Sequence, residues 1–164
     1  MKFNYCPICG RKLDEKGSWD EGVVPYCPVD DVFYFDTPKP CIVVAVLNGS
    51  KILLLKQSYI YKNSKVLLSG YVSNGETVEE TVHREVMEES GLKIKGLRYL
   101  GSDYVEEKGL VMLTFMAEYD GGKLKKSCEV EGINWTDIQD AISEMSEDFI
   151  GKRVVNKILD ILES

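Results

Sequence analysis

The segment Gly70–Leu92 reads GYVSNGETVEETVHREVMEESGL, and its repeating pattern predicts the local structure. From position 76 to position 90, Val78, Val82 and Val86 recur every four residues, which is the spacing of an apolar stripe along one face of an α-helix. Gly91 follows directly, and a glycine there is a typical helix end because it adopts a left-handed conformation at little cost. We therefore expect a helix over residues 76–90 that buries its valines.

Carboxylates gather on the same helix beside the valine stripe. Glu85, Glu88 and Glu89 are three and four positions apart, so at about 100° per residue their side chains share one edge. Carboxylates this close repel one another and raise each other's pKa unless a cation or an arginine offsets the charge. Mg²⁺ and Mn²⁺ prefer such oxygen ligands, and a metal held by carboxylates and substrate phosphates suits phosphate-ester chemistry. The alternative is a solvated acidic helix face.

The sequence around this segment predicts a mixed α/β domain. Apolar, β-rich runs separated by turns indicate strands, and apolar residues four apart indicate helices. The expected strands cover residues 41–47, 51–56, 69–72, 92–100, 110–119 and 133–135, with turns at Asn48-Gly49-Ser50 and Asp120-Gly-Gly122. Two further helices are expected over residues 137–145 and 149–162. The core residues expected in the last helix are Ile150, Val154, Ile158 and Leu162.

Length and charge exclude several classes of protein. The chain has 164 residues, 44% of them apolar, so it can bury a substantial core. Its 20 Lys and Arg residues against 27 Asp and Glu residues give a net charge of −7, which disfavours non-specific binding to nucleic acid. We find no apolar run of about 18 to 20 residues, as a membrane span needs, and no secretory signal in the opening residues. We therefore expect a cytoplasmic protein that does not bind membranes.

Cysteines mark the turn-rich amino-terminal residues 1–36, which contain few apolar side chains. The chain has five cysteines, an odd number that does not fit a complete disulfide framework. Cys6-Pro-Ile-Cys9 and Cys27-Pro-Val-Asp30 instead predict a zinc site with three sulfur ligands and an aspartate oxygen. Asp31 or water are alternatives to Asp30 as the fourth ligand. A ribbon that keeps its shape without metal is the alternative to zinc binding.

A linker separates this zinc-ribbon-like segment from the second domain. Asp36-Thr-Pro-Lys-Pro40 is expected to be extended, because each proline disfavours helix at the residue before it. The second domain then covers residues 37–164. Its cysteines Cys41 and Cys128 fall in or near expected strands, and we expect both to be buried without a chemical role.

Residues 70–92 resemble the box of the Nudix hydrolase family, G-x5-E-x7-R-E-U-x-E-E-x-G-U, where U is a bulky aliphatic residue. Every fixed position is occupied at the required spacing, by Gly70, Glu76, Arg84, Glu85, Val86, Glu88, Glu89, Gly91 and Leu92. The resemblance implies an α/β/α sandwich that uses Mg²⁺ or Mn²⁺. It also implies a hydrolase that cleaves the diphosphate bond of a nucleoside diphosphate linked to another group.

The resemblance also implies a role for each polar residue of the box. The implied metal ligands are the carboxylates of Glu85, Glu88 and Glu89 and the carbonyl of Gly70. Arg84 and Glu76 are expected to orient these carboxylates.

The general base is left open among several glutamates. Glu89 is the first choice. Glu129 is the second, because Glu129-Val-Glu-Gly-Ile-Asn-Trp135 is similar to the family's E-x5-W segment; the alternative for Glu129 is a surface strand residue. Glu106 and Glu107, in a loop that a glycine follows, are weaker candidates and are typical of solvated side chains.

The chain as a whole resembles the NADH pyrophosphatase branch of the family, which also acts on NAD-capped RNA. The resemblance rests on the order of a zinc ribbon, Pro40-Cys-Ile-Val-Val-Ala-Val46 and Gly70-Tyr-Val-x-x-Gly-Glu-Thr77. Residues 98–109 lack that branch's downstream S-Q-P-W-P-F-P-x-S motif, and Ser73 replaces an acid of G-F-V-E-x-G-E. The substrate therefore stays open between NADH or NAD and ADP-ribose or another nucleoside diphosphate derivative. A capped RNA end is the nucleic acid that the resemblance allows, and a homodimer is also left open.

Binding residues for the rest of the substrate stay unassigned. Tyr59, Tyr61, Tyr71, Tyr104 and Phe115 are candidates for stacking on an aromatic ring, although such side chains in strands are often core residues. A lone helical histidine, here His83, is more often a surface residue than an acid–base group. The alternative function is a catalytically silent module that senses a nucleotide or binds a protein. A degenerate box is typical of such modules, and this box is complete.

Overall fold

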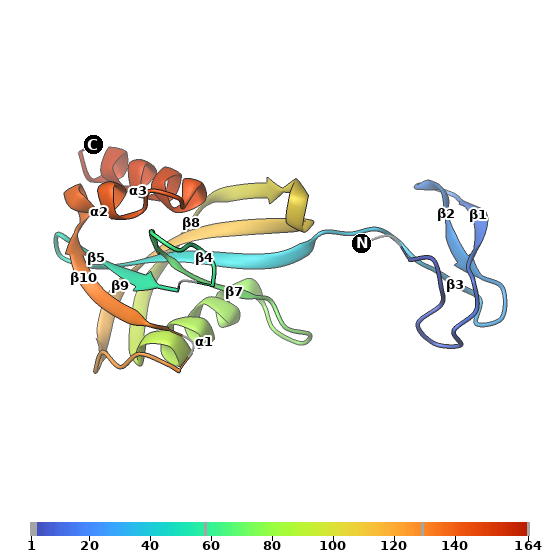
Figure 1. The fold of residues 1–164 in the computed structure, drawn as a ribbon, viewed down its shortest axis with the longest axis horizontal. Coiled ribbons are helices and arrows are strands. Elements are labelled where there is room, and N and C mark those ends of the chain that lie inside the picture. Colours follow the sequence, from blue (N-terminus) through green and yellow to red (C-terminus); the bar gives the residue numbers. More distant parts are fainter. Residues whose placement is uncertain (1–2, 58, 129, 164) are drawn as a thin grey trace. The chain divides into compact units, whose positions relative to one another are not determined.

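The computed structural model describes residues 3–57, 59–128 and 130–163. The chain divides into two compact units, Met1–Pro38 and Lys39–Ser164, and each is described by itself (Figure 1). Within the described part of the chain, no helix is both long enough and apolar enough to cross a membrane.

A small antiparallel sheet organises the first unit. Its strands β1 (Asp14–Ser18), β2 (Gly22–Cys27) and β3 (Val32–Phe33) pair in the order β1-β2-β3. Among the residues of this unit that the structure describes, only Cys6 and Cys27 have buried side chains. Because few apolar side chains are buried, hydrophobic stabilisation of this unit is small. The unit therefore depends on other interactions.

A seven-stranded mixed sheet forms the centre of the second unit. Its main path has the order β10-β5-β4-β9-β8, while β6 pairs with β5 and β7 pairs with β4. The β4–β9 pair is parallel, and the other pairs are antiparallel. The strands are β4 (Lys39–Asn48), β5 (Lys51–Lys56), β6 (Lys65–Val66), β7 (Leu68–Tyr71), β8 (Leu92–Val105), β9 (Leu110–Gly122) and β10 (Gly132–Asp137).

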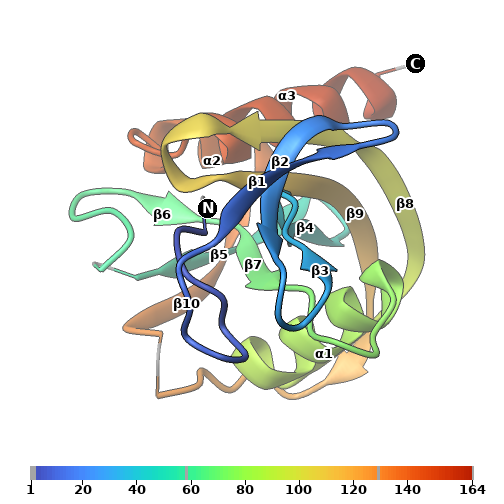
Figure 2. The same ribbon diagram turned by 90° about the vertical axis from the view of Figure 1, so that its right-hand side faces the viewer.

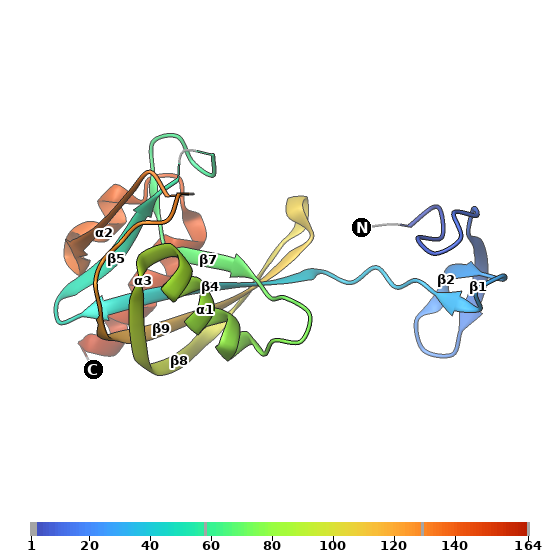
Figure 3. The same cartoon turned by 90° about the horizontal axis from the view of Figure 1, so that it is seen from below.

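Helices cover both faces of this sheet and produce three layers (Figures 1 and 3). Helix α1 (Val78–Ser90) packs on one face. Helices α2 (Ile138–Glu144) and α3 (Phe149–Leu162) pack on the other. This arrangement confirms the predicted mixed α/β sandwich.

Strand β4 shows how the sequence specifies the two covered faces. Successive side chains of a strand point to opposite sides of the sheet. One set joins the core cluster that contains Val82 and Val86 of α1, and it comprises Ile42, Val44 and Val46. The other set joins the cluster that contains Val154 of α3, and it comprises Val43, Ala45 and Leu47. Because both faces are buried, the strand reads as an uninterrupted apolar run.

Helix α1 begins and ends at its cap residues. The Thr77 side chain accepts a hydrogen bond from the Glu80 backbone, and the Glu80 carboxylate accepts one from the Thr77 backbone, which forms a capping box. Thr77 is extended, so the helix begins at Val78 rather than at Glu76 as the sequence predicts. Gly91 ends the helix in a left-handed conformation with φ 69°, as expected.

The hairpin formed by β8 and β9 is longer than the sequence predicts. β8 continues past Leu100 to Val105, and the short helix η1 (Glu106–Lys108) closes the hairpin. β9 extends to Gly122, where a turn is expected, and Gly122 pairs with Leu92. Pairing with β8 satisfies the backbone N–H and C=O groups of Gly121 and Gly122. The sequence of β9 alone does not show that β8 extends far enough to pair with them.

Two residues expected in the interior are exposed. Leu162, in the last turn of α3, is 57% exposed, although Val154 and Ile158 of the same helix are buried and Ile150 is half-buried. Cys128 is exposed in the segment between β9 and β10. Periodicity marks one face of an element, but burial also needs a second element that covers the residue.

The glycine after α1 provides a test of this geometry. A Cβ at Gly91 would lie 2.8 Å from the Lys123 carbonyl oxygen in addition to the cost of φ 69°. Gly75 has φ 88° with open space around the same position, so it is a matched control. We expect Gly75→Ala to lower the free energy of unfolding by about 1–2 kcal/mol and Gly91→Ala to lower it by about 1–3 kcal/mol more. Urea denaturation followed by circular dichroism measures both, and equal losses would contradict the steric argument.

Candidate active site and cysteine cluster

Strand β7, the loop after it and helix α1 supply the candidate active site. β7 pairs with β4 in the sheet and leads through the loop into α1 (Figure 2). Because β4 lies inside the sheet and α1 packs on it, both supporting elements are anchored in the core. The predicted residues are Gly70 in β7, Glu76 in the loop, and Arg84, Glu85, Glu88 and Glu89 in α1.

The Arg84 guanidinium lies at the centre of this group. Its Nε and Nη2 donate to the two carboxylate oxygens of Glu76 at 2.7 and 3.0 Å, a bidentate pair. Its Nη1 donates to Glu85 Oε1 at 2.8 Å and to Glu88 Oε2 at 3.0 Å. Its Nη2 also donates to the Tyr71 carbonyl oxygen at 3.2 Å, at the end of β7. Arg84 therefore links the helix to the strand and holds these carboxylates together.

The carboxylates that share Arg84 differ in their electrostatics. Hydrogen bonds from Arg84 lower the pKa of Glu76, so this group stays ionised. Burial raises the pKa of Glu85 above its ordinary value even though Arg84 opposes the shift. The Glu85 side chain is 14% exposed, whereas that of Glu88 is 59% exposed. Glu85 is thus the partly desolvated carboxylate that gains most from an additional cation.

Gly70 allows the Glu85 carboxylate to lie against strand β7. A Cβ at position 70 would overlap with Cδ and Oε1 of Glu85. Any side chain at this position would therefore push the carboxylate away from the strand. The requirement for glycine here is steric contact with Glu85 rather than a left-handed backbone.

Glu89 is held from a different element. Its side chain is buried, with 7% exposure, and its Oε1 accepts a hydrogen bond from Gln57 Nε2 at 3.0 Å. Gln57 follows β5 directly and is itself 2% exposed. Sequence reasoning missed Gln57, because it lies 32 positions from its partner and outside any motif. No local signal marks it, because the preceding strand, Lys51-Ile-Leu-Leu-Leu-Lys56, already ends in a polar residue.

A cavity of about 890 Å³ lies beside these residues within the second unit. Gly70, Arg84, Glu85 and Glu89 contribute to its wall. Other lining residues come from the segment after β5, from the end of β7, from the β8–β9 hairpin and from the start of α3; they include Tyr59, Tyr61, Tyr71, Glu107, Lys108 and Asp148. The volume is in the range of small-ligand sites.

The remaining candidates lie in varied surroundings. Phe115 is 3% exposed and belongs to the core, while Tyr104 is 64% exposed on β8. His83 is exposed on α1, as expected. Glu106 is exposed in η1. Glu129 lies outside the described residues.

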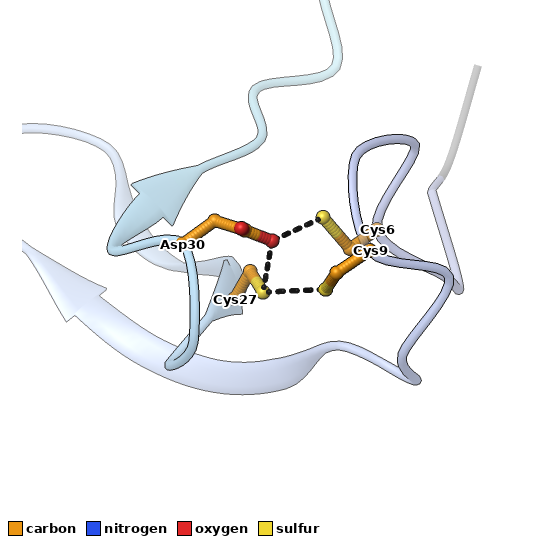
Figure 4. A group of neighbouring side chains, drawn as sticks. All are labelled: Cys6, Cys9, Cys27 and Asp30. Carbon is orange, nitrogen blue, oxygen red and sulfur yellow. Dashed lines mark hydrogen bonds between the residues drawn. The ribbon is translucent and has the colours of Figure 1, made fainter.

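Three cysteines and an aspartate converge in the first unit (Figure 4). The potential ligand atoms of Cys6, Cys9, Cys27 and Asp30 all lie within 4.8 Å of one another. The thiols of Cys6 and Cys27 donate to Asp30 Oδ2 at 3.1 and 3.2 Å, and the sulfurs of Cys9 and Cys27 are 3.6 Å apart. Asp31 is instead bound by the Tyr26 hydroxyl. Of the two adjacent aspartates, Asp30 is therefore the one that joins the cysteines.

This cluster also differs from the helix site in how closely its ligands approach. Within the described part of the chain, it is the only group of at least three His, Cys, Asp or Glu ligands gathered within 4.8 Å. The carboxylates of α1 share an edge of the helix, as predicted. They do not approach one another as closely, because Glu85 and Glu88 bind Arg84 and Glu89 binds Gln57. In the cluster, the Asp30 carboxylate raises the pKa of Cys9 to about 12.

A family model described as the NUDIX domain matches residues 37–157. This match covers most of the chain. The fold and the site thus define a known class, and the chain belongs to the Nudix family, as the motif predicts.

Related proteins of known name include NAD-capped RNA hydrolases called NudC. The NudC of Pectobacterium carotovorum subsp. carotovorum (strain PC1) is 38% identical over 121 residues, which cover 74% of this chain and 45% of that protein. The NudC of Chromobacterium violaceum is 39% identical over 137 residues, which cover 83% of this chain and 52% of that protein. The chain therefore spans about half the length of these relatives.

Solved structures support the same fold. A NUDIX hydrolase from Nitrosomonas europaea has a TM-score of 0.78 at 20% identity, covering 98% of this chain and 93% of that chain. An ADP-ribose pyrophosphatase from Streptococcus suis has a TM-score of 0.60 at 21% identity, covering 77% and 91%. A UDP-X diphosphatase has a TM-score of 0.66 at 21% identity, covering 79% and 65%.

The Arg84 network predicts how the nearby carboxyl groups titrate. We expect Glu76 to titrate below its ordinary pKa of 4.5 and to move up toward it in Arg84→Met. Carboxyl ¹³C NMR titration measures this shift. Glu80, whose pKa is lowered chiefly by the Thr77 backbone, is the internal control and should stay low in both proteins.

The same shift has a consequence for stability. Because the pKa of folded Glu76 lies below its unfolded value, its contribution to stability is present above pH 4.5 and is lost as the pH falls through the folded pKa. We expect this acid-side loss to be smaller in Arg84→Met. An unchanged Glu76 pKa in the variant would contradict the assigned role of Arg84.

Proposed function

We propose that the second unit is a metal-dependent hydrolase that cleaves the diphosphate bond of a nucleoside diphosphate derivative. The observation that carries this proposal is the carboxylate group organised by Arg84 beside a cavity of about 890 Å³. Related proteins are named for action on NAD-capped RNA, ADP-ribose and UDP-X, all of which fit such a substrate. We assign residues 37–164 to this domain and residues 1–36 to the zinc-ribbon-like segment.

The donor set fits Mg²⁺ or Mn²⁺. Both ions prefer carboxylate, carbonyl and water oxygens. Arg84 binds one oxygen each of Glu85 and Glu88, and no described residue hydrogen-bonds Glu85 Oε2 or Glu88 Oε1. The proposed ligands are these two oxygens, a carboxylate oxygen of Glu89 and the carbonyl oxygen of Gly70. The raised pKa of Glu85 supports the choice, since a cation offsets the cost of burying its charge.

The protein residues then have separate tasks. A bound metal would neutralise phosphate charge and lower the pKa of a water molecule. Arg84 and Glu76 hold the carboxylates in place, and the bidentate pair resists rotation of the guanidinium. We assign Glu89 as the first choice for the general base, because its carboxylate is buried at the cavity wall. Glu107 lines the same cavity and remains a weaker candidate.

The cavity wall supports a substrate with an aromatic ring. Tyr59, Tyr61 and Tyr71 line the cavity, and Tyr59 and Tyr71 expose most of their surface. Lys108, on the hairpin that replaces the missing downstream motif, adds a cation to the same wall. These residues fit the base and the phosphates of NADH, NAD and ADP-ribose equally, so they do not discriminate among these three substrates.

Product analysis with matched variants tests the activity. We expect the wild type to cleave NADH, NAD or ADP-ribose with Mg²⁺ or Mn²⁺. We expect Glu88→Gln and Glu89→Gln to lose about 100-fold or more while remaining folded. Glu79→Gln, an exposed glutamate of the same helix, is the control and should keep wild-type turnover.

The outcomes distinguish the candidate functions. Cleavage of NADH or NAD to AMP and the nicotinamide mononucleotide would support the dinucleotide branch, and NAD-capped RNA would be the next substrate. Preference for ADP-ribose would show that the zinc-ribbon-like segment does not determine which substrate is cleaved. Full turnover by both Gln variants would contradict the metal role. Tight ADP-ribose binding without any product would instead support the silent nucleotide-sensing module.

We further propose that Cys6, Cys9, Cys27 and Asp30 bind a structural Zn²⁺. Three sulfurs and one oxygen form an acceptable tetrahedral donor set, and their close approach supports the proposal. Zinc would displace the protons now shared between the thiols and Asp30. It would also supply the stabilisation that the small apolar content of this unit does not.

Metal analysis and chelator competition test the zinc site. We expect one Zn²⁺ per chain, loss of that ion in Cys27→Ser, and tighter retention in Asp30→Cys because a fourth thiolate strengthens the site. Cys128→Ser is the matched control, since Cys128 is an exposed cysteine outside the cluster. Equal zinc content in Cys27→Ser and Cys128→Ser would overturn this assignment.

A further inference from the structure

The contact between Gln57 and Glu89 joins two buried side chains from distant parts of the second unit. Gln57 is 2% exposed and Glu89 is 7% exposed. The Gln57 Nε2 donates to Glu89 Oε1 at 3.0 Å. A buried carboxylate without a donor is costly, so a donor at this position determines where the carboxylate rests.

The chemical nature of the donor matters for a metal site. Arg84 is a cation, and it partly neutralises Glu76, Glu85 and Glu88. The Gln57 amide is neutral and does not titrate, so it orients Glu89 without cancelling its charge. The hydrogen bond from Gln57 therefore adds no positive charge beside Glu89.

Gln57 is also connected to the cavity wall through its backbone. Its carbonyl oxygen accepts hydrogen bonds from the backbone N–H groups of Ile60 and Tyr61, at 2.9 and 3.2 Å. Tyr61 lines the cavity. One residue thus holds Glu89 with its side chain and a cavity-lining segment with its main chain.

We propose that Gln57 is a positioning residue that fixes the Glu89 carboxylate for metal binding and turnover. This inference rests on the proposed function of the site. Gln57 itself contacts neither the metal nor the reacting atoms; it acts through Glu89. Outer partners of metal ligands typically change metal affinity or activity by about 10- to 100-fold when they are removed.

Two substitutions at position 57 test the proposal, and an exposed glutamine provides the control. Gln57→Met keeps the length of the side chain without a donor, and Gln57→Glu keeps its shape but replaces the donor with a carboxylate. Gln139→Met, at an exposed glutamine of α2, is the matched control. Mn²⁺ dissociation constants are measured by electron paramagnetic resonance on zinc-saturated protein, with Glu88→Gln reporting background binding. Circular dichroism sets a temperature at which every variant is folded.

We expect Gln57→Met to weaken Mn²⁺ binding about tenfold or more. The Mn²⁺ dissociation constant of Gln57→Glu should also differ from that of the wild type, whereas that of Gln139→Met should match it. In a Glu89→Gln background, Gln57→Met should cause no further loss, because its effect passes through Glu89. Folded Gln57 variants with wild-type Mn²⁺ affinity and turnover would overturn the proposal. So would an equal loss with and without the Glu89 carboxylate, which would indicate a general structural role.

The same experiment separates this inference from the proposed function. Wild-type protein that binds Mn²⁺ without cleaving any substrate would overturn the hydrolase assignment, while the comparison of Gln57 variants would still decide the positioning role. Wild-type protein with no Mn²⁺ binding above the Glu88→Gln background would overturn both.

Discussion

Arg84 donates hydrogen bonds from helix α1 to three carboxylates and to the Tyr71 carbonyl at the end of strand β7. The carboxylates repel one another, and the Arg84 cation among them offsets this repulsion. A planar guanidinium with several donors meets this need, whereas a lysine would not bind Glu76 through two parallel bonds. Arg84 therefore fixes the positions of these three carboxylates relative to one another.

The charge of the site is divided between two kinds of partner. Arg84 partly compensates the carboxylates around it, and the neutral amide of Gln57 donates a hydrogen bond to Glu89 without adding a positive charge. Burial opposes the ionisation of Glu85, and the absence of a Cβ at Gly70 lets this carboxylate lie against the strand. The result is a negative wall beside a cavity that also carries tyrosines and Lys108. Such a wall favours a divalent cation and, through it, phosphate groups.

The two units of the chain achieve order in different ways. The second unit buries apolar side chains on both faces of a seven-stranded sheet, and this core anchors α1 and β7. Among its described residues, the first unit buries only two side chains, and the segments Cys6–Cys9 and Cys27–Asp30 bring three thiols and a carboxylate together. Zinc binding would stabilise the first unit far more than the second. In the first unit, metal–ligand bonds would supply the stabilisation that an apolar core supplies in the second.

The sequence by itself determined the elements and the class of site. Val78, Val82 and Val86 predict the helix, and the spacing of Glu85, Glu88 and Glu89 predicts a shared edge. The spacings Cys6-Pro-Ile-Cys9 and Cys27-Pro-Val-Asp30 predict the cluster, because all of these are local periodicities or short spacings. Tertiary structure decided which aspartate joins the cysteines, how far β8 and β9 extend, and that Leu162 and Cys128 are exposed. It also decided that Gln57 holds Glu89. These features depend on contacts between residues far apart in the chain, and such contacts leave no periodic signal in either partner's own sequence.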